Sequence, residues 1–247
     1  MKVEYIMKKI IIFDLDGTLC PIGGGIAARD IAYLKELEQR GLRLCICSGK
    51  PVSYLSGLCR QLGMGDMILM GENGLVIQFG SFYPPEHAVT LSYSKKIKRA
   101  LQQVQEDLEE LIPDLWFQPN RVVLTPFPRT EEQFDLIQTY LDGHPELLEG
   151  VTVFRHVDSF DLIPDGLTKY EGLRRLTELT GISPEEMIAV GDGVNDIPMF
   201  RYAGLSLGIG LPDQPEVDGS FDTITEALEY ILSNSVQLCE LRIKPDR

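Results

Sequence analysis

The sequence has few basic residues: 23 Lys and Arg stand against 37 Asp and Glu, a formal net charge of −14 over 247 residues. Phosphate backbones and anionic membrane surfaces repel such a chain, so we expect neither nucleic acid nor a membrane as a partner. No apolar run is long enough to span a bilayer. The apolar stretch near the N-terminus is interrupted at Asp14 and Asp16, which argues against a signal peptide.

Cysteine is also sparse, with five residues, an odd number, and no CxxC pair. The sequence therefore does not predict a disulfide framework or a zinc site built from such pairs. We expect reduced, buried core thiols at Cys20, Cys45, Cys47, Cys59 and Cys239. Reduced thiols and the lack of a signal sequence favour a cytoplasmic location.

Short apolar runs rich in β-branched residues alternate with segments of helical periodicity along most of the chain. This alternation is typical of a parallel sheet covered by helices on both faces, so we predict an α/β fold with a doubly wound, Rossmann-like parallel sheet. Strands are expected at 8–15, 42–47, 67–70, 187–190 and 205–209, a hairpin at 75–79 with 82–83, and helices at 26–37, from Pro51, at 168–179, at 196–202 and at 225–232, the last capped by Thr225.

The pattern changes between about residues 86 and 163. Its elements follow the order β-α-β-β-α-β of a small open-faced sandwich. The expected elements are a helix at 95–111, strands at 116–118 and 121–125, a helix at 131–141, and strands at 151–154 and 159–163. We therefore predict a core formed by 1–85 and 164–247, interrupted by an inserted α+β domain at 86–163.

Two carboxylates follow the first predicted strand, in the segment Asp-Leu-Asp-Gly-Thr at 14–18. Open α/β sheets bind their ligands at the carboxyl ends of the strands, where Asp14 and Asp16 would lie. Two close carboxylates share a proton or recruit a cation, and Gly17 permits the tight turn that brings them together. Taken alone, the segment is also compatible with an ordinary turn or helix cap.

A second acidic loop, Gly-Asp-Gly-Val-Asn-Asp at 191–196, follows the predicted strand at 187–190. By itself it could be a loop that ends in an Asp or Asn helix cap. Two acidic loops at the carboxyl ends of strands in one sheet instead form a hard, oxygen-rich site. The pair of loops therefore predicts a magnesium site.

Two further positions are compatible with phosphate binding. Ser48 and Gly49 close the second strand and precede a helix whose N-terminus would bind an anion, although Ser48 could simply cap that helix. Lys169 stands at the start of another helix, where it opposes the helix dipole. That position favours a role in phosphate binding, with a solvated surface lysine as the alternative.

In this order, the four segments resemble the motifs of the haloacid dehalogenase-like hydrolase superfamily. The insertion is similar to the large α/β cap of its subfamily IIB phosphatases, and Gly-Glu-Asn-Gly at 71–74 is similar to a loop of archaeal-type phosphoglycolate phosphatases. Lys50 departs from the pattern, because many sugar-phosphate phosphatases of the subfamily carry arginine after the glycine.

The resemblance implies a role for each matching residue. Asp14 would be the nucleophile and Asp16 the general acid and base of a hydrolase that forms an aspartyl phosphate. Mg²⁺ would be the cofactor, held by Asp14, by the backbone carbonyl of Asp16, by Asp192, and by Asp196 directly or through water. The residues expected to bind phosphate or substrate are Thr18, Ser48, Gly49, Asn73, Arg121, Lys169 and Asn195.

For Arg121, an exposed arginine at a strand end is the alternative. The expected substrate is a small phosphorylated metabolite, either a phosphoglycolate-like acid or a sugar phosphate, whose leaving group the inserted domain would read. Two alternatives remain open: a phosphomutase of the same superfamily, and a catalytically silent protein that binds a phosphometabolite. The sequence also leaves open whether the protein is a monomer or a homodimer.

Overall fold

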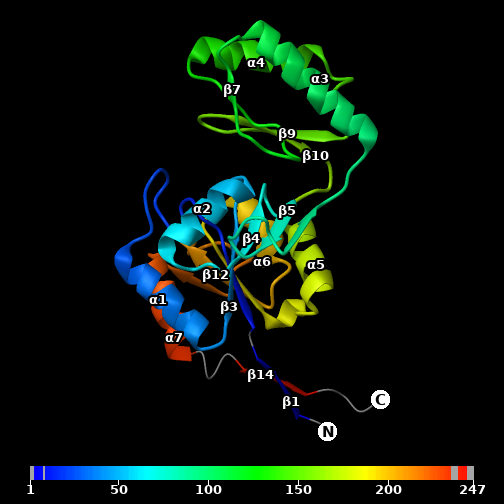
Figure 1. The fold of residues 1–247 in the computed structure, drawn as a ribbon. Helices are drawn as coiled ribbons and strands as arrows, with labels where there is room; N and C mark the ends of the chain where they lie inside the picture. The colour runs from blue at the N-terminus through cyan, green and yellow to red at the C-terminus, as the bar shows by residue number, and fades with distance from the viewer. Residues whose placement is uncertain (1–2, 8, 235–238, 244–247) are drawn as a thin grey trace. The chain divides into compact units, whose positions relative to one another are not determined.

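The computed structural model describes residues 3–7, 9–234 and 239–243, with side chains from 9 to 234. The chain divides into two compact units. Met1–Ala88 and Thr168–Arg247 form the first, and Val89–Leu167 the second (Figure 1). In the described part of the chain, no helix is long and apolar enough to cross a membrane.

The first unit is built on a sheet in the order β13-β12-β11-β2-β3-β4-β5-β6. The strands from β13 to β4 run parallel, and β5 pairs antiparallel with β4. This confirms the predicted doubly wound α/β fold. The strands are β2 (Ile10–Phe13), β3 (Arg43–Cys47), β4 (Ile68–Gly71), β5 (Val76–Phe79), β6 (His87–Thr90), β11 (Met187–Gly191), β12 (Leu205–Ile209) and β13 (Gly219–Phe221).

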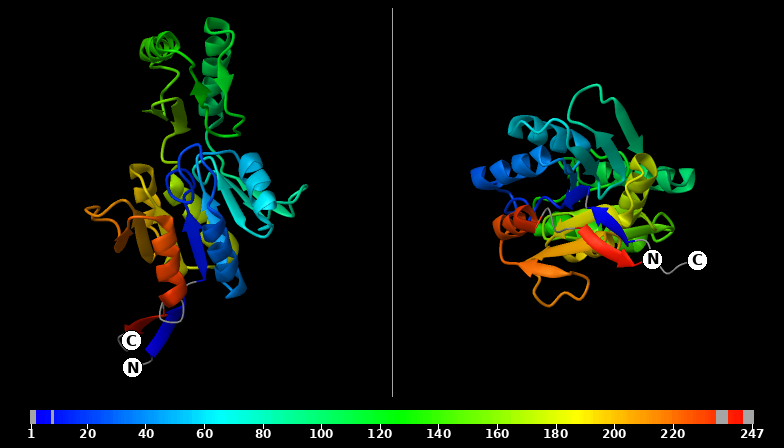
Figure 2. Two further views of the ribbon diagram at one scale, coloured as in Figure 1. Left: turned by 90° about the vertical axis from the view of Figure 1, so that its left-hand side faces the viewer. Right: turned by 90° about the horizontal axis from the view of Figure 1, so that it is seen from below.

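The central strands are apolar at successive positions because both faces of the sheet are covered. Every residue of β2 is buried, and Ile11 and Phe13 pack with residues of three helices on one face. These helices are α1 (Ala28–Gln39), α2 (Val52–Leu62) and α7 (Ile224–Asn234), with α1 and α7 side by side in Figure 2. Met70 points the opposite way from Leu69 and meets α5 (Lys169–Thr180) on the other face.

The remaining elements of the first unit are short. They are the 3₁₀ turns η1 (Pro184–Glu186) and η2 (Val194–Asp196), the helix α6 (Ile197–Phe200), and the antiparallel pair of β1 (Val3–Met7) with β14 (Cys239–Ile243). Cys20, Cys45, Cys47 and Cys59 are buried free thiols, as predicted. The side chain of Cys239 lies outside the described residues.

The second unit has its own core. Two antiparallel pairs, β7 (Trp116–Phe117) with β8 (Pro126–Phe127) and β9 (Val151–Arg155) with β10 (Phe160–Pro164), are linked by a single bridge between Leu124 and Leu162. The helices α3 (Lys95–Leu111) and α4 (Glu131–Gly143) contribute buried residues that pack with those of β10.

The strand predicted at 121–125 is wrong. The backbone bends at 121–122, Leu124 forms an isolated bridge, the Thr125 carbonyl accepts from the N–H of Gln118, and a strand begins only with β8 at Pro126. Asn120 accepts a hydrogen bond from Gln118 Nε2 and donates one to Thr125 Oγ1. Such local side-chain hydrogen bonds compete with a strand ladder.

Three further predictions need correction. Phe82 and Tyr83 form no strand, because β5 pairs with β4 on one side and with β6, at His87–Thr90, on the other. The cap of α7 is Thr223, whose Oγ1 accepts from the N–H of Glu226, whereas Thr225 donates to Asp30. The helix predicted at 196–202 is the 3₁₀ turn η2 followed by the short α6, because the Asp196 carboxylate binds the N–H groups at the start of the loop.

Candidate active site

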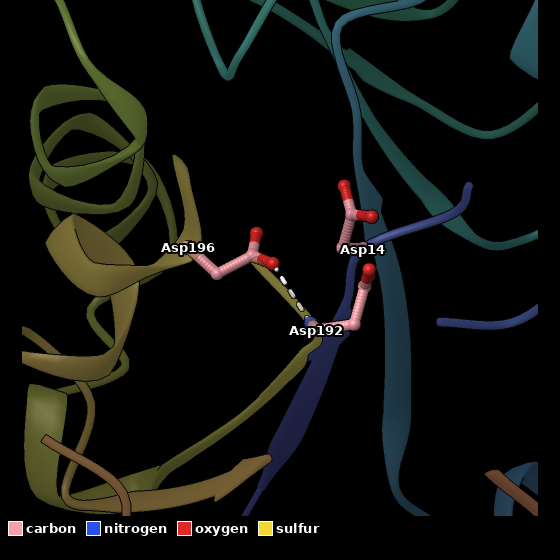
Figure 3. Close-up of side chains that lie close together, drawn as sticks. All are labelled: Asp14, Asp192 and Asp196. Atoms are coloured by element: carbon pink, nitrogen blue, oxygen red, sulfur yellow. Dashed lines mark hydrogen bonds between the residues drawn. The ribbon is translucent and has the colours of Figure 1, made fainter. Parts of the chain in front are cut away.

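The carboxyl ends of β2 and β11 bring three carboxylates together. The N–H of Asp14 donates to the carbonyl of Val190 at 2.9 Å, which extends the parallel pairing of these strands and aligns Asp14 with the loop after β11. Carboxylate oxygens of Asp14, Asp192 and Asp196 lie within 4.8 Å of one another (Figure 3). The convergence follows from two adjacent parallel strands that end at the same edge of the sheet.

A tight loop after Asp14 brings the next residues to this edge. The N–H of Cys20 donates to the carbonyl of Leu15 at 3.1 Å, and the N–H of Gly17 donates to the carbonyl of Cys20 at 2.7 Å. Gly17 has φ +91°, and a Cβ there would lie 2.2 Å from an Asp192 carboxylate oxygen. Only glycine allows this conformation and this approach together.

Asp196 is completely buried, and both of its carboxylate oxygens are engaged. Its Oδ2 accepts from the N–H groups of Asp192 and Gly193, each at 3.0 Å, and its Oδ1 accepts from Lys169 at 2.6 Å. A Cβ on Gly191 would lie 2.5 Å from the Asp196 carboxyl carbon, so the bare glycine makes room for this side chain.

Lys169 is the internal cation of the site, with a side chain that is 1% exposed. Its Nζ donates to Asp14 and to Asp196, each at 2.6 Å. Burial alone would lower the pKa of Lys169, but the two carboxylates outweigh burial and raise it. The ammonium stays charged because opposite charges lie so close. The solvated surface lysine considered above is therefore wrong.

Burial dominates the electrostatics of the neighbouring carboxyls. It raises the pKa of Asp14 to about 6, against the opposing effect of Lys169. Burial also raises the pKa of Asp192. The Thr18 hydroxyl, which donates to Asp192 Oδ1 at 2.5 Å, lowers that pKa and so offsets part of the rise. Crowded carboxylates in a buried place favour protonation or a bound cation.

The Ser48 loop is held by the turn between β4 and β5. The N–H of Asn73 donates to the carbonyl of Ser48 at 2.9 Å, and the N–H of Glu72 donates to that of Lys50 at 3.0 Å. Glu72 and Asn73 have φ values of 54° and 58°, an uncommon conformation for residues other than glycine. Ser48 is buried, and its Oγ accepts from the N–H of Lys50 at 3.3 Å.

The three clustered carboxylates fit a magnesium ion. Carboxylate oxygens are hard donors of the kind Mg²⁺ prefers, and Lys169 contributes one positive charge against three negative ones. The Asp16 carboxylate is not part of the cluster, because its Oδ2 pairs with Lys50 Nζ at 3.3 Å.

Nearly all the expected site residues belong to the first unit. They are Asp14, Asp16, Thr18, Ser48, Gly49, Asn73, Lys169, Asp192, Asn195 and Asp196. Asn195 is exposed on the η2 turn. Arg121 belongs to the second unit, where it is exposed. Lys50, which departs from the family pattern, pairs with Asp16, and no local sequence signal predicts this contact.

Comparison with known proteins gives consistent relatives. The sequence model of a family described as haloacid dehalogenase-like hydrolase matches residues 11–110 and 86–211. A phosphoglycolate phosphatase of Archaeoglobus fulgidus is 25% identical over 236 residues, which cover 90% of this chain and 96% of that protein.

Two solved structures share the fold. A haloacid dehalogenase-like hydrolase from Bacteroides thetaiotaomicron has 21% identity and a TM-score of 0.70, with 91% of this chain and 99% of that chain covered. A subclass IIB sugar phosphatase has 21% identity and a TM-score of 0.66, with the same coverage of 91% and 99%.

Proposed function

The chain belongs to the haloacid dehalogenase-like hydrolases and is a phosphatase. From that premise we propose that it hydrolyses phosphomonoesters with Mg²⁺ through an aspartyl phosphate on Asp14. The observation that supports the proposal best is the cluster of Asp14, Asp192 and Asp196 around Lys169, with Asp16 on the adjoining loop. The substrate is a small phosphorylated metabolite, either an acid such as the one named for the Archaeoglobus relative or a sugar phosphate.

In the first step, a carboxylate oxygen of Asp14 forms a bond to phosphorus while the bond from phosphorus to the ester oxygen breaks. Asp16 gives its proton to the departing oxygen, which leaves as an alcohol. In the second step, a water oxygen attacks phosphorus, Asp16 takes a proton from that water, and the bond to Asp14 breaks. The products are the alcohol and inorganic phosphate, and both aspartates return to their initial states.

Asp14, Asp192 and the Asp16 carbonyl would hold the metal, and Asp196 would hold it directly or through water. When bound, Mg²⁺ supplies positive charge that reduces the repulsion between a carboxylate nucleophile and a phosphoryl group. Lys169 keeps Asp14 oriented through its 2.6 Å hydrogen bond and adds a second positive charge. Cations fixed in place before the reaction form a preorganised site for a transferring phosphoryl group.

The other first-unit residues would bind phosphoryl oxygens. They are Thr18, Ser48, Gly49, Asn73 and Asn195. The Ser48 hydroxyl already accepts from Lys50 and can direct its own proton to a phosphoryl oxygen. We assign part of the substrate selection to the inserted unit, expected at 86–163, with Arg121 as its candidate residue.

The first test concerns turnover. Asp14→Asn should abolish release of inorganic phosphate from p-nitrophenyl phosphate, because an amide oxygen is a poor nucleophile at phosphorus. Asp16→Asn should slow release by about 100- to 10,000-fold, the usual cost of a lost general acid. Circular dichroism would verify that both near-isosteric variants fold.

Wild-type rates in folded Asp14→Asn would disprove the covalent mechanism. Activity in excess chelator, with metal absent by elemental analysis, would disprove the role of Mg²⁺. Conversion of a phosphate ester to its isomer without phosphate release would instead support the mutase.

A further inference from the structure

A second lysine lies at the same edge of the sheet. Lys50 Nζ pairs with Asp16 Oδ2 at 3.3 Å, and the two side chains are 35% and 28% exposed. Lys169 is 1% exposed, and its Nζ is already bound by two carboxylates. Of these two site cations, Lys50 is the one that is partly exposed to solvent.

The backbone of Lys50 is held from both sides. Its N–H donates to Ser48 Oγ at 3.3 Å, and its carbonyl accepts from the N–H of Glu72 at 3.0 Å. A Cβ on Gly71 would lie 2.8 Å from that carbonyl oxygen, so the turn packs directly on the lysine's backbone. The base of the side chain is therefore fixed, and its ammonium end is directed to Asp16.

The site carries more carboxyls than ammonium groups, so a second anionic group on a substrate is unfavourable there unless it lies next to a cation. Asp14, Asp16, Asp192 and Asp196 contribute four carboxyls, and Lys169 and Lys50 contribute two ammonium groups. A substrate that carries a carboxylate besides its phosphate is repelled unless a cation meets that carboxylate. Lys50 can meet that carboxylate if its ammonium group leaves the Asp16 carboxylate and pairs with the substrate's carboxylate instead.

We propose that Lys50 is a specificity-determining residue that binds a carboxylate on the carbon bearing the ester oxygen. The inference rests on the proposed function, in which Asp16 protonates that oxygen and must come within hydrogen-bond reach of it. A carboxylate one carbon away then lies beside the ammonium that contacts Asp16 at 3.3 Å. The preferred substrate class is therefore phosphorylated α-hydroxy acids, of which 2-phosphoglycolate is the smallest.

The test compares three phosphate esters on wild type, Lys50→Met and Lys50→Arg. 2-Phosphoglycolate has the carboxylate, ethyl phosphate has a methyl group in its place, and 3-phosphooxypropionate moves the carboxylate one methylene away. Wild type should prefer 2-phosphoglycolate to both others. Lys50→Met should lower its kcat/KM by about 10- to 150-fold, the effect of one charged hydrogen bond, mainly through KM. The kcat/KM of Lys50→Met for ethyl phosphate should fall by less than about 3-fold, which is below that range.

Lys50→Arg keeps the charge and should restore most of the preference. Lys9→Met is the matched control, because Lys9 pairs with Glu186 near the opposite end of β2 and should leave all three substrates unchanged. If Lys50→Met fails to fold, Lys50→Gln serves the same comparison.

Equal losses on the acid and on ethyl phosphate would overturn the inference, because Lys50 would then act only through Asp16. A wild type that hydrolyses ethyl phosphate as well as 2-phosphoglycolate would also overturn it and leave the proposed function intact. A wild type that hydrolyses no phosphate ester would overturn the proposed function itself.

Discussion

At the scale of single residues, the site depends on glycines, which have no side chain, as much as on charged residues. Gly17 and Gly191 each stand where a Cβ would collide with a carboxylate, Asp192 in the first case and Asp196 in the second. Gly17 also has a positive φ, so substitution there combines strain with collision. Gly191 has no positive φ, which makes it the cleaner position for an experiment.

Gly191→Ala should displace the Asp196 carboxylate. The new Cβ would lie 2.5 Å from the Asp196 carboxyl carbon, which is held by two N–H groups and by Lys169. Overpacking of this kind costs about 1–3 kcal/mol. If that strain appears at the metal site, half-maximal activity should need about 5- to 150-fold more Mg²⁺. A titration of phosphate release against Mg²⁺ measures the effect.

Gly57→Ala is the control for Gly191→Ala. Gly57 is exposed in α2, and a Cβ there would meet nothing within 4 Å. The substitution should stabilise the protein by about 0.4–1 kcal/mol and leave the Mg²⁺ requirement unchanged. An unchanged Mg²⁺ requirement in Gly191→Ala would contradict the expectation that displacing Asp196 weakens metal binding.

At the scale of elements, the close approach of α5 to the turn between β4 and β5 positions Lys169. A Cβ on Gly172 would lie 2.7 Å from the carbonyl oxygen of Gly74 and 2.9 Å from the Met70 side chain. Gly172 lies three residues after Lys169, on a nearby face of the helix. The same turn holds the Ser48 loop, so one small segment supports two parts of the site.

Gly172→Ala should push α5 away from this turn and move Lys169 Nζ from Asp14. We expect a loss of about 1–3 kcal/mol in stability from overpacking and a fall in kcat with little change in KM, since the lysine acts on the nucleophile. Denaturant unfolding and steady-state kinetics measure the two effects. A variant with normal kcat would show that α5 can shift without affecting the nucleophile.

The strands and the acidic loops could be predicted from the sequence because their signals are local. Apolar runs that end in Asp and Gly indicate buried parallel strands, and parallel strands place their loop residues at one edge. The confirmed core elements are of this kind. The strand predicted at 121–125 does not form. The side chain of Asn120 makes local hydrogen bonds there, which the hydrophobic periodicity of the sequence does not indicate.

The environment of the lysines could not be predicted in the same way. Lys169 donates to Asp14, which is 155 positions away, and Lys50 pairs with Asp16 across two loops. The position of a lysine near the start of a helix predicts neither contact. The burial of each lysine and the carboxylate it pairs with depend on the packing of segments that are distant in the sequence. The cap of α7 illustrates a smaller failure, since Thr223 and Thr225 are both suitable residues and only the hydrogen bonds distinguish them.

At the scale of the whole molecule, a net charge of −14 has to be reconciled with an anionic substrate. Distant surface charges are screened over about 8–10 Å at physiological salt, whereas groups inside the site are screened much less. The local balance is four carboxyls against Lys169 and Lys50. With all four carboxyls ionised, a divalent cation would bring that balance from −2 to zero, so metal binding and substrate binding should be linked.

The same balance predicts that Mg²⁺ stabilises the folded first unit. Three carboxyls within 4.8 Å repel one another in the absence of metal, and the unfolded chain has no such cluster to bind it. A ligand that binds only the folded state contributes about 2.7 kcal/mol at 100 times its Kd. For a chain of this size, that corresponds to about 5–11 °C in the midpoint of thermal unfolding. Calorimetry with Mg²⁺ and with chelator measures the shift.

Asp192→Asn separates metal binding from simple charge repulsion. In chelator, the variant should unfold at or above the wild-type temperature, because burial and Asp196 already raise the pKa of Asp192 and make its charge unfavourable. With Mg²⁺, most of the stabilisation should disappear, since a carboxylate ligand has been replaced by a neutral amide. Asp66→Asn, at an exposed position of the same unit, should keep the full Mg²⁺ shift. An undiminished shift in Asp192→Asn would place the metal somewhere other than at this cluster.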